Sequence, residues 1–332
     1  MKLIKLVLFS MMIGIMPYYG CKSVKRTTMI PIRSKKIVIA HRGASGYLPE
    51  HTMEAKAMAY AMHADFIEQD LVLSKDDIPI VIHDIHLETV TDVTTKFPER
   101  KRKDGRFYVI DFTYEELQTL NVTERFDPIT KKAVFPKRYP LWKSKFKLHA
   151  LKDEIELIQG LNKSTGKQIG IYPEIKEPKF HLKEGKDISK IVVKTLSEYG
   201  YKSKSDYCIL QCFDAQELKR IRKELKSDLF LLQLIEFKKD EKYLKDYAKY
   251  ADGLGPWYKQ ILEGKDSNGN WQYSDLVKEA HELGLFVHAY TFREDDLDGF
   301  NSFKEMIDFG FRNLKLDGVF TDFPDKAVIF RK

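Results

Sequence analysis

The sequence predicts an α/β fold, a (β/α)₈ TIM barrel with a long insertion after the second strand. Short apolar runs alternate with longer amphipathic segments, which is the order that builds a parallel sheet. About eight such units follow one another, a number typical of a closed barrel. A doubly wound sheet would show a glycine-rich first turn and longer Val/Ile runs, and the chain has neither. Its 332 residues, 43% of them hydrophobic, are ample for one large core.

The expected strands share short runs of branched apolar residues: 36–40, 65–73, 168–175, 207–212, 229–235, 251–257, 285–291 and 317–321. The expected helices are 51–63, 150–162, 187–199, 214–225, 240–249, 274–283 and 295–309. A further strand, 78–82, follows the turn 74–77 and is expected to form a hairpin with 65–73. Residues 84–149 lack clear periodicity and are too long for a plain loop. We interpret them as a small insertion whose extended loop covers the active site.

The N-terminal segment is typical of an export signal. Lys2 and Lys5 precede the apolar run 6–17, which is short for a membrane span, and Gly20-Cys21 follows it. We interpret 1–20 as a signal peptide, Cys21 as a lipidation site, 21–35 as a tether and 36–332 as the barrel. The chain is then an exported lipoprotein, periplasmic or at the cell surface, anchored to a membrane through Cys21. An ordinary secretory signal with an incidental cysteine is the alternative.

Net charge and cysteine content exclude few classes of protein. The net charge of +7 is a mild excess on a chain in which 32% of residues are charged, so a mixed surface is expected and nucleic-acid binding is not. The two remaining cysteines, Cys208 and Cys212, lie four apart in one strand, too far for a disulfide. We expect them to be small core residues.

Chemistry-bearing residues gather at the ends of the first strands. His41-Arg42 ends the first strand, Glu68-x-Asp70 lies in the second, and His83-Asp84 ends the hairpin. Two histidines can act as acid and base in one turnover. Carboxylates at i and i+2 of a strand share a face and suit a hard divalent cation. The combination predicts cleavage of a phosphodiester.

Two further strand ends extend this group. Pro173-Glu174-Ile175-Lys176 ends the third strand and Gln211–Asp214 the fourth, on the catalytic face of such barrels. A symmetric turn near Asp76-Asp77 would place Asp70 opposite His83 in the hairpin. The other histidines are expected to be surface or packing residues: His51, His63, His86, His149, His181, His281 and His288.

These residues resemble a known family. The strings IVIAHRGASGYLPEHTMEA, FIEQDLVLSKD, IPIVIHD, GIYPEIK and GVFTDFP occur in this order and look like a glycerophosphodiester phosphodiesterase. The resemblance runs from about Lys36 to Phe330. The large insertion and LWKSKF resemble the exported bacterial branch, which includes lipid-anchored enzymes. His51 departs from the family pattern, which often has Asn there, and this implies altered hydrogen bonding around the site.

The resemblance implies a role for each matching position. His41 and His83 match the acid/base pair, and Glu68, Asp70 and Glu174 match ligands of a divalent metal, commonly Ca²⁺ and in some members Mg²⁺. Arg42, Glu50 and Lys176 match groups that bind substrate. The implied reaction is hydrolysis of glycerophosphodiesters to sn-glycerol 3-phosphate and an alcohol. A phospholipase-D-like lyase acting on sphingomyelin or lysophospholipid stays open, as does a surface lipoprotein that binds ligands without catalysis. Preferred headgroup and oligomeric state are not predicted.

Overall fold

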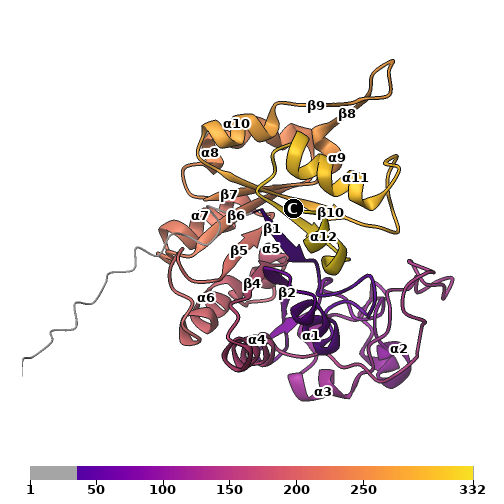
Figure 1. Ribbon diagram of the computed structural model, residues 1–332. Coiled ribbons are helices and arrows are strands. Elements are labelled where there is room, and N and C mark those ends of the chain that lie inside the picture. Colours follow the sequence, from indigo (N-terminus) through magenta and orange to yellow (C-terminus); the bar gives the residue numbers. More distant parts are fainter. Residues whose placement is uncertain (1–35, 332) are drawn as a thin grey trace, which may run out of the picture.

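Eight parallel strands close into a barrel in the computed structural model, which describes residues 36–331 (Figure 1). The barrel strands are β1 Ile37–Ala40, β2 Phe66–Leu73, β4 Gly170–Ile175, β5 Ile209–Cys212, β6 Phe230–Ile235, β7 Gly253–Pro256, β10 Phe286–Phe292 and β11 Gly318–Thr321. They lie in the order β1-β11-β10-β7-β6-β5-β4-β2, and β1 pairs with β2 to complete the circle. The predicted fold class is confirmed, and every predicted barrel strand is present.

Helices cover the outside of the barrel (Figure 1). The main ones are α1 Met53–Ala61, α4 Leu151–Thr165, α6 Ile188–Glu198, α7 Ala215–Lys223, α8 Leu244–Tyr247, α10 Leu276–Glu282, α11 Phe303–Asp308 and α12 Pro324–Phe330. Their starts follow the local sequence. Thr52 caps α1 by accepting from the backbone N of Ala55, and Asp214 caps α7 by accepting from the backbone N of Gln216 and of Glu217. Gly166, with φ +70°, ends α4 in the left-handed conformation.

Two predicted helices differ from the structure, and several short elements were not predicted. The helix expected at 240–249 is a 3₁₀ turn, Lys238–Tyr243, followed by the single turn α8. The helix expected at 295–309 begins only at Phe303, because Asp298 and Gly299 have positive φ and Ser302 caps the new start. Outside the insertion, the unpredicted elements are α5 Pro178–Lys183, α9 Tyr258–Ile261, the hairpin of β8 Leu262–Lys265 with β9 Trp271–Tyr273, and α12 after the last strand.

The hairpin after β2 forms, but in a different register from the one predicted. Its second strand, β3 Pro79–Val81, pairs antiparallel with β2 so that Leu71 faces Val81. The backbone N of Ile82 then donates to the carbonyl of Asp70 over 2.9 Å, so Asp70 faces Ile82. The prediction that Asp70 faces His83 is therefore wrong by one residue. The cause is the position of the turn. The backbone N of Ser74 donates to the carbonyl of Ile78, and Asp77 between them has a left-handed backbone (φ +62°), so the turn is centred at Asp76.

The insertion follows β3 and contains little regular structure. Its elements are α2 Val93–Lys96, α3 Tyr114–Thr119 and the 3₁₀ turns Pro98–Arg100 and Val109–Asp111. It has its own apolar cluster, in which Phe112 and Leu117 pack beneath Val72 and Ile80 of the hairpin. The insertion therefore packs as a compact layer against the hairpin.

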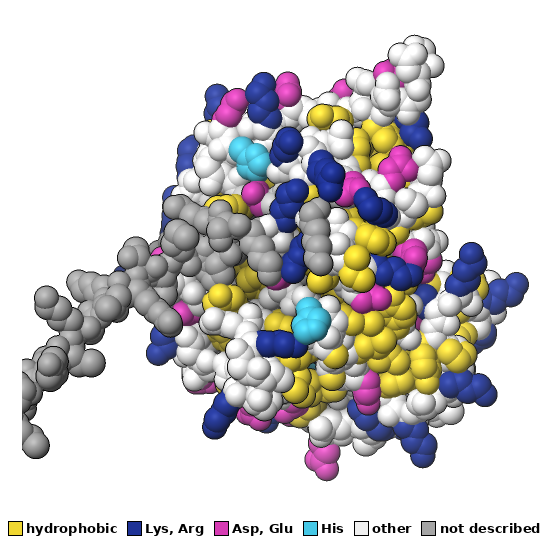
Figure 2. Space-filling model, in the orientation of Figure 1, with side chains coloured by type: hydrophobic (Ala, Val, Ile, Leu, Met, Phe, Trp, Pro, Cys, Tyr) yellow, Lys and Arg dark blue, Asp and Glu magenta, His cyan; other side chains and the backbone are white. Residues whose placement is uncertain are grey.

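Two apolar layers hold the barrel together. One lies between strands and helices, and a smaller one fills the barrel interior, where Tyr172, Phe230 and Phe320 are buried. Gly170 leaves room for this filling, since a Cβ there would lie 2.3 Å from the ring of Phe66. Charged side chains of both signs are scattered over the face shown in Figure 2, between apolar and uncharged polar groups. Within residues 36–331, no helix is long and apolar enough to cross a membrane.

Candidate active site

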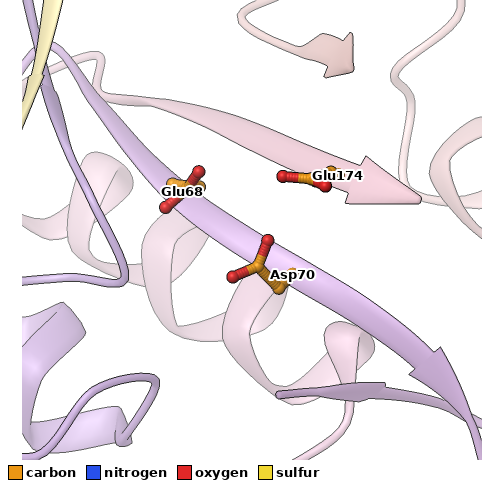
Figure 3. Close-up of side chains that lie close together, drawn as sticks. All are labelled: Glu68, Asp70 and Glu174. Carbon is orange, nitrogen blue, oxygen red and sulfur yellow. The ribbon is translucent and has the colours of Figure 1, made fainter. Parts of the chain in front are cut away.

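Three carboxylates converge where the middle of β2 lies beside the carboxyl end of β4 (Figure 3). Glu68 and Asp70 alternate along β2 and so share one face, and Asp70 pairs in register with Glu174 on β4. One oxygen from each lies within 4.8 Å of the others, and all three side chains are buried. Carboxylate oxygens are the ligands that hard divalent cations prefer. The cluster can therefore hold a metal ion.

The electrostatics of the cluster also fit a cation. Burial and the charges of Asp70 and Glu174 raise the pKa of Glu68 well above its usual range. Burial raises the pKa of Glu174 to about 8, with Asp70 adding to the effect and Lys176 opposing it. Burial acts in the same direction on Asp70, but Lys176 and His51 outweigh it and hold the pKa of that carboxyl well below its usual value. A cation would relieve the repulsion that burial makes costly.

One oxygen of the cluster, Oδ1 of Asp70, accepts no hydrogen bond from the described residues, although Nζ of Lys176 lies 3.7 Å from it. This oxygen is buried, while Oδ2 of Asp70 lies 2.7 Å from Nε2 of His51. His51 therefore supports the cluster directly and is more than a packing residue. Lys176 Nζ contacts Glu174 Oε1 at 2.8 Å. These contacts orient the carboxylates and leave Oδ1 of Asp70 available as a ligand.

The turn after β1 brings Arg42 to the cluster. Arg42 has a left-handed backbone (φ +56°), and its backbone N donates to Oε2 of Glu68 over 2.8 Å. Gly43 follows with φ +87°, and a Cβ there would lie 2.9 Å from the carbonyl carbon and oxygen of Ala55. Only glycine fits both demands at that position. The short sequence His41-Arg42-Gly43 thus builds a tight turn against α1.

Glu50 lies behind this turn and binds two arginines. It accepts from Nη1 of Arg42 over 2.9 Å and from Nη2 of Arg125 over 2.6 Å. Burial raises its pKa, but these two guanidinium groups outweigh the effect and keep the carboxyl ionised. Glu50 therefore positions Arg42. The Nε of Arg42 is buried and donates no hydrogen bond among the described residues.

Each predicted catalytic histidine has a carboxylate partner at Nδ1. His41 Nδ1 lies 2.6 Å from Oδ1 of Asp322, and His83 Nδ1 lies 2.6 Å from Oδ1 of Asp84. An ionised carboxylate can only accept, so Nδ1 carries the proton and Nε2 of each neutral ring is left as the acceptor. Burial lowers the pKa of both histidines to about 4, although Asp322 and Asp84 oppose it.

All but one of the predicted chemical residues line one open cavity of about 1490 Å³: His41, Arg42, Glu68, Asp70, His83, Glu174 and Lys176. Glu50 lines instead a small neighbouring pocket of about 220 Å³, together with Arg125 and Arg138. His288, expected to be a surface or packing residue, is fully buried and forms a hydrogen bond with the hydroxyl of Tyr172 over 2.8 Å. Cys21 lies outside the described residues.

The sequence pattern missed several supporting residues. Asp322 follows β11 and is held by Arg138 of the insertion and Arg293, each at 2.7 Å. Arg125, also from the insertion, joins Glu50 to Asp84. The only available signals were the adjacency of Asp84 to His83 and the position of Asp322 just after the last strand. Neither indicates a partner until the fold is known.

The fold and the site define an α/β-barrel enzyme that combines a buried carboxylate cluster, able to hold a metal ion, with two carboxylate-held histidines. Comparison with known proteins is more specific. Residues 41–326 match the glycerophosphoryl diester phosphodiesterase family, and the chain belongs to that family. The glycerophosphodiester phosphodiesterase of Haemophilus influenzae is 47% identical and aligns with 100% of this chain and 99% of its own. The Treponema pallidum enzyme of the same name is 40% identical, with 90% and 92% covered.

Solved structures share the fold at lower identity. A phosphodiesterase of Oleispira antarctica, in complex with the product sn-glycerol-3-phosphate, has a TM-score of 0.60 at 20% identity, covering 89% of this chain and 96% of its own. A glycerophosphodiester phosphodiesterase of Agrobacterium tumefaciens has a TM-score of 0.59 at 18% identity, covering 89% and 99%. At these identities the likeness shows the common barrel.

Proposed function

We propose that this chain hydrolyses glycerophosphodiesters to sn-glycerol 3-phosphate and an alcohol, using a divalent cation held by Glu68, Asp70 and Glu174. The observation that carries the proposal is one cavity lined by both carboxylate-held histidines and the buried carboxylate cluster. The names of the two relatives at 47% and 40% identity support the substrate class. Ca²⁺ is the first candidate ion and Mg²⁺ the second, since both take oxygen ligands.

The residues of the chain have distinct tasks in this proposal. The guanidinium of Arg42, whose Nε makes no hydrogen bond to the described residues and lies 3.7 Å from Oδ2 of Asp70, donates to a phosphate oxygen, and Lys176 adds positive charge beside it. Nε2 of one histidine takes a proton from the attacking hydroxyl of water or glycerol, while the other histidine must begin the step protonated at both nitrogens and gives its Nε2 proton to the leaving alcohol. Attack by glycerol leaves a cyclic phosphate, which water opens in a second step with the two roles reversed. A bound cation would supply Lewis-acid stabilisation of charge on the phosphate. Asp322 and Asp84 hold the two imidazoles in place throughout.

A product assay tests the proposal. Wild-type protein should release sn-glycerol 3-phosphate from glycerophosphocholine, while His41→Ala and His83→Ala should each lower kcat at least about a hundredfold, the usual contribution of a positioned acid or base. His281→Ala is the matched control, because this histidine pairs with Asp317 and does not line the cavity. Wild-type rates in both test variants would refute the mechanism. Products from sphingomyelin or lysophosphatidylcholine, with none from glycerophosphocholine, would favour the lyase alternative.

We also propose that the chain is exported and anchored to a membrane through an acylated Cys21. Lys2, Lys5, the apolar run 6–17 and Gly20-Cys21 support this, and all lie outside the described residues. Cells grown with labelled palmitate should yield labelled wild-type protein and unlabelled Cys21→Ser protein. Equal labelling of the two would refute the anchor, whereas secretion without label would favour an ordinary signal peptide.

A further inference from the structure

One segment of the insertion is strongly basic. We call residues 127–145 the basic loop; it contains Asp127 as its single acidic residue. Its exposed lysines are Lys131, Lys132, Lys137, Lys143 and Lys145. None of these five ammonium groups forms an ion pair with a carboxylate of residues 36–331. The basic loop therefore has an uncompensated positive charge on its surface.

The same segment exposes large apolar side chains. Ile129 is 90% exposed, and Val134 and Trp142 are each 49% exposed. A solvated surface gains nothing from an isoleucine in this position. Together with the lysines, the three side chains make the basic loop amphipathic: apolar groups that can leave water stand beside cations that can bind anions.

The exposure of Ile129 is built into the loop. Oδ1 of Asp127 accepts from the backbone N of Ile129 and of Thr130, each over 2.8 Å. The backbone N of Lys131 donates to the carbonyl of Asp127, also over 2.8 Å, so residues 127–131 form a hydrogen-bonded turn. Trp142 is fixed by its backbone N, which donates to Thr123 Oγ1 over 2.7 Å, and by its ring against Phe126. Ile129 therefore projects from an ordered turn, while Trp142 lies against Phe126 with about half of its surface exposed.

The basic loop also borders the active site. Val134, Phe135 and Arg138 line the small pocket that His41 and His83 share. Arg138 reaches Asp322, the partner of His41, at 2.7 Å. The insertion occupies the lower right of Figure 1, in purple and magenta, and Figure 2 shows dark-blue Lys and Arg side chains projecting from that edge. A surface bound by the basic loop would lie beside the entrance to the cavity.

We propose that the basic loop docks on an anionic lipid bilayer and thereby holds the active-site entrance next to the membrane. Charge complementarity selects an anionic partner, and the exposed Ile129 and Trp142 select a bilayer over a nucleic acid. A polyanion would pair with the lysines but leave the isoleucine in water, whereas a bilayer takes up both. This docking is independent of the proposed hydrolysis and of the anchor at Cys21.

Vesicle binding tests the docking. Full-length protein carrying Cys21→Ser in every sample, so that no acyl chain is present, is mixed with phosphatidylcholine vesicles with or without phosphatidylglycerol and sedimented. Binding should require phosphatidylglycerol and weaken as salt is raised. Lys131→Glu/Lys132→Glu should weaken it at least about twentyfold, because each lysine near an anionic surface contributes about a fivefold factor. Ile129→Ser should weaken it about tenfold.

Matched variants separate the basic loop from net charge and general hydrophobicity. Lys163→Glu/Lys202→Glu makes the same charge change at exposed sites before β4 and β5, at the opposite end of the barrel. Ile329→Ser removes another exposed isoleucine, 61% exposed on α12. Both controls should bind vesicles like the parent. Equal losses in test and control variants would overturn the proposal, as would binding to RNA without binding to vesicles. Activity on soluble glycerophosphocholine reports separately on the proposed function.

Discussion

Removing divalent ions with EDTA is expected to lower the release of sn-glycerol 3-phosphate at least about a thousandfold, with recovery when Ca²⁺ or Mg²⁺ is added back. A bound cation contributes several kcal/mol of charge stabilisation to such a reaction. Nothing else in the described cluster can replace it, since Lys176 already pairs with Glu174 at 2.8 Å. The recovery obtained with each ion identifies the one that serves the reaction best.

Binding of the ion should depend on pH in a defined direction. Without a cation, burial raises the pKa of Glu174 to about 8 and that of Glu68 well above its usual range. Protons therefore compete with the ion at neutral pH, and affinity should fall as the pH drops from about 8 toward 6. Calorimetry in two buffers of different ionisation enthalpy should show protons released on binding. This measurement does not depend on catalysis.

A variant pair isolates the contribution of the cluster. Glu174→Gln removes one ligand, whereas Glu177→Gln changes an exposed glutamate two residues beyond β4 that lines the same cavity but lies outside the carboxylate cluster. We expect the first to lose both ion binding and activity and the second to retain both. Full activity of metal-free wild-type protein, verified by elemental analysis, would show that the three carboxylates act without an ion.

The sequence predicted those parts of the site that lie at strand ends. In a parallel barrel all carboxyl ends meet on one face, so His41, Glu68 and Glu174 needed only correct strand assignments to be placed together. The alternation of apolar runs was sufficient for this. An error of one residue in the predicted start or end of a strand does not change which side of the barrel wall its side chains face.

Details that depend on turns and on distant segments could not be predicted. The pairing of Asp70 was wrong by one residue because a left-handed Asp77 shifts the turn, and no local pattern marks that conformation. Asp322 meets Arg138 across 184 positions of sequence, through an insertion that lacks periodicity. Such contacts come from the packing of irregular chain, for which residue spacing carries no information.

The sequence of the first helix also gave no sign that one of its charged side chains is buried. Lys56 lies among small apolar residues of α1 and would be expected at the surface, yet it is fully buried. Its Nζ donates to the carbonyl of Glu68 and lies 3.2 Å from Oε1 of Glu154 on α4. Glu154 also accepts from Gln69 over 2.7 Å and from His149 over 2.9 Å. One buried network thus joins two helices to the strand that supplies two of the carboxylates.

Replacing Lys56 by methionine is expected to lower the free energy of unfolding, measured by urea denaturation, by about 3–5 kcal/mol. Methionine has similar length, so the loss comes mainly from the carboxylate of Glu154, which stays buried without its cation. Burial raises the pKa of that carboxyl, but Lys56 and His149 outweigh it and hold the pKa at about 2. Lys163→Met, at an exposed position of α4, the helix that carries Glu154, should change stability by less than about 0.5 kcal/mol.

The double variant Lys56→Met/Glu154→Gln should recover at least about half of that loss, because removal of both partners leaves no uncompensated charge. The amide oxygen introduced by Glu154→Gln can still accept from Gln69, so the hydrogen bond to the strand survives. The loss in Lys56→Met should also shrink at acid pH. Without Lys56 the pKa of Glu154 rises above its unfolded value, so the penalty is absent below the unfolded pKa and grows as pH rises through the folded one. A double variant no more stable than Lys56→Met would show instead that the lysine stem contributes by packing, and the deficit would then be independent of pH.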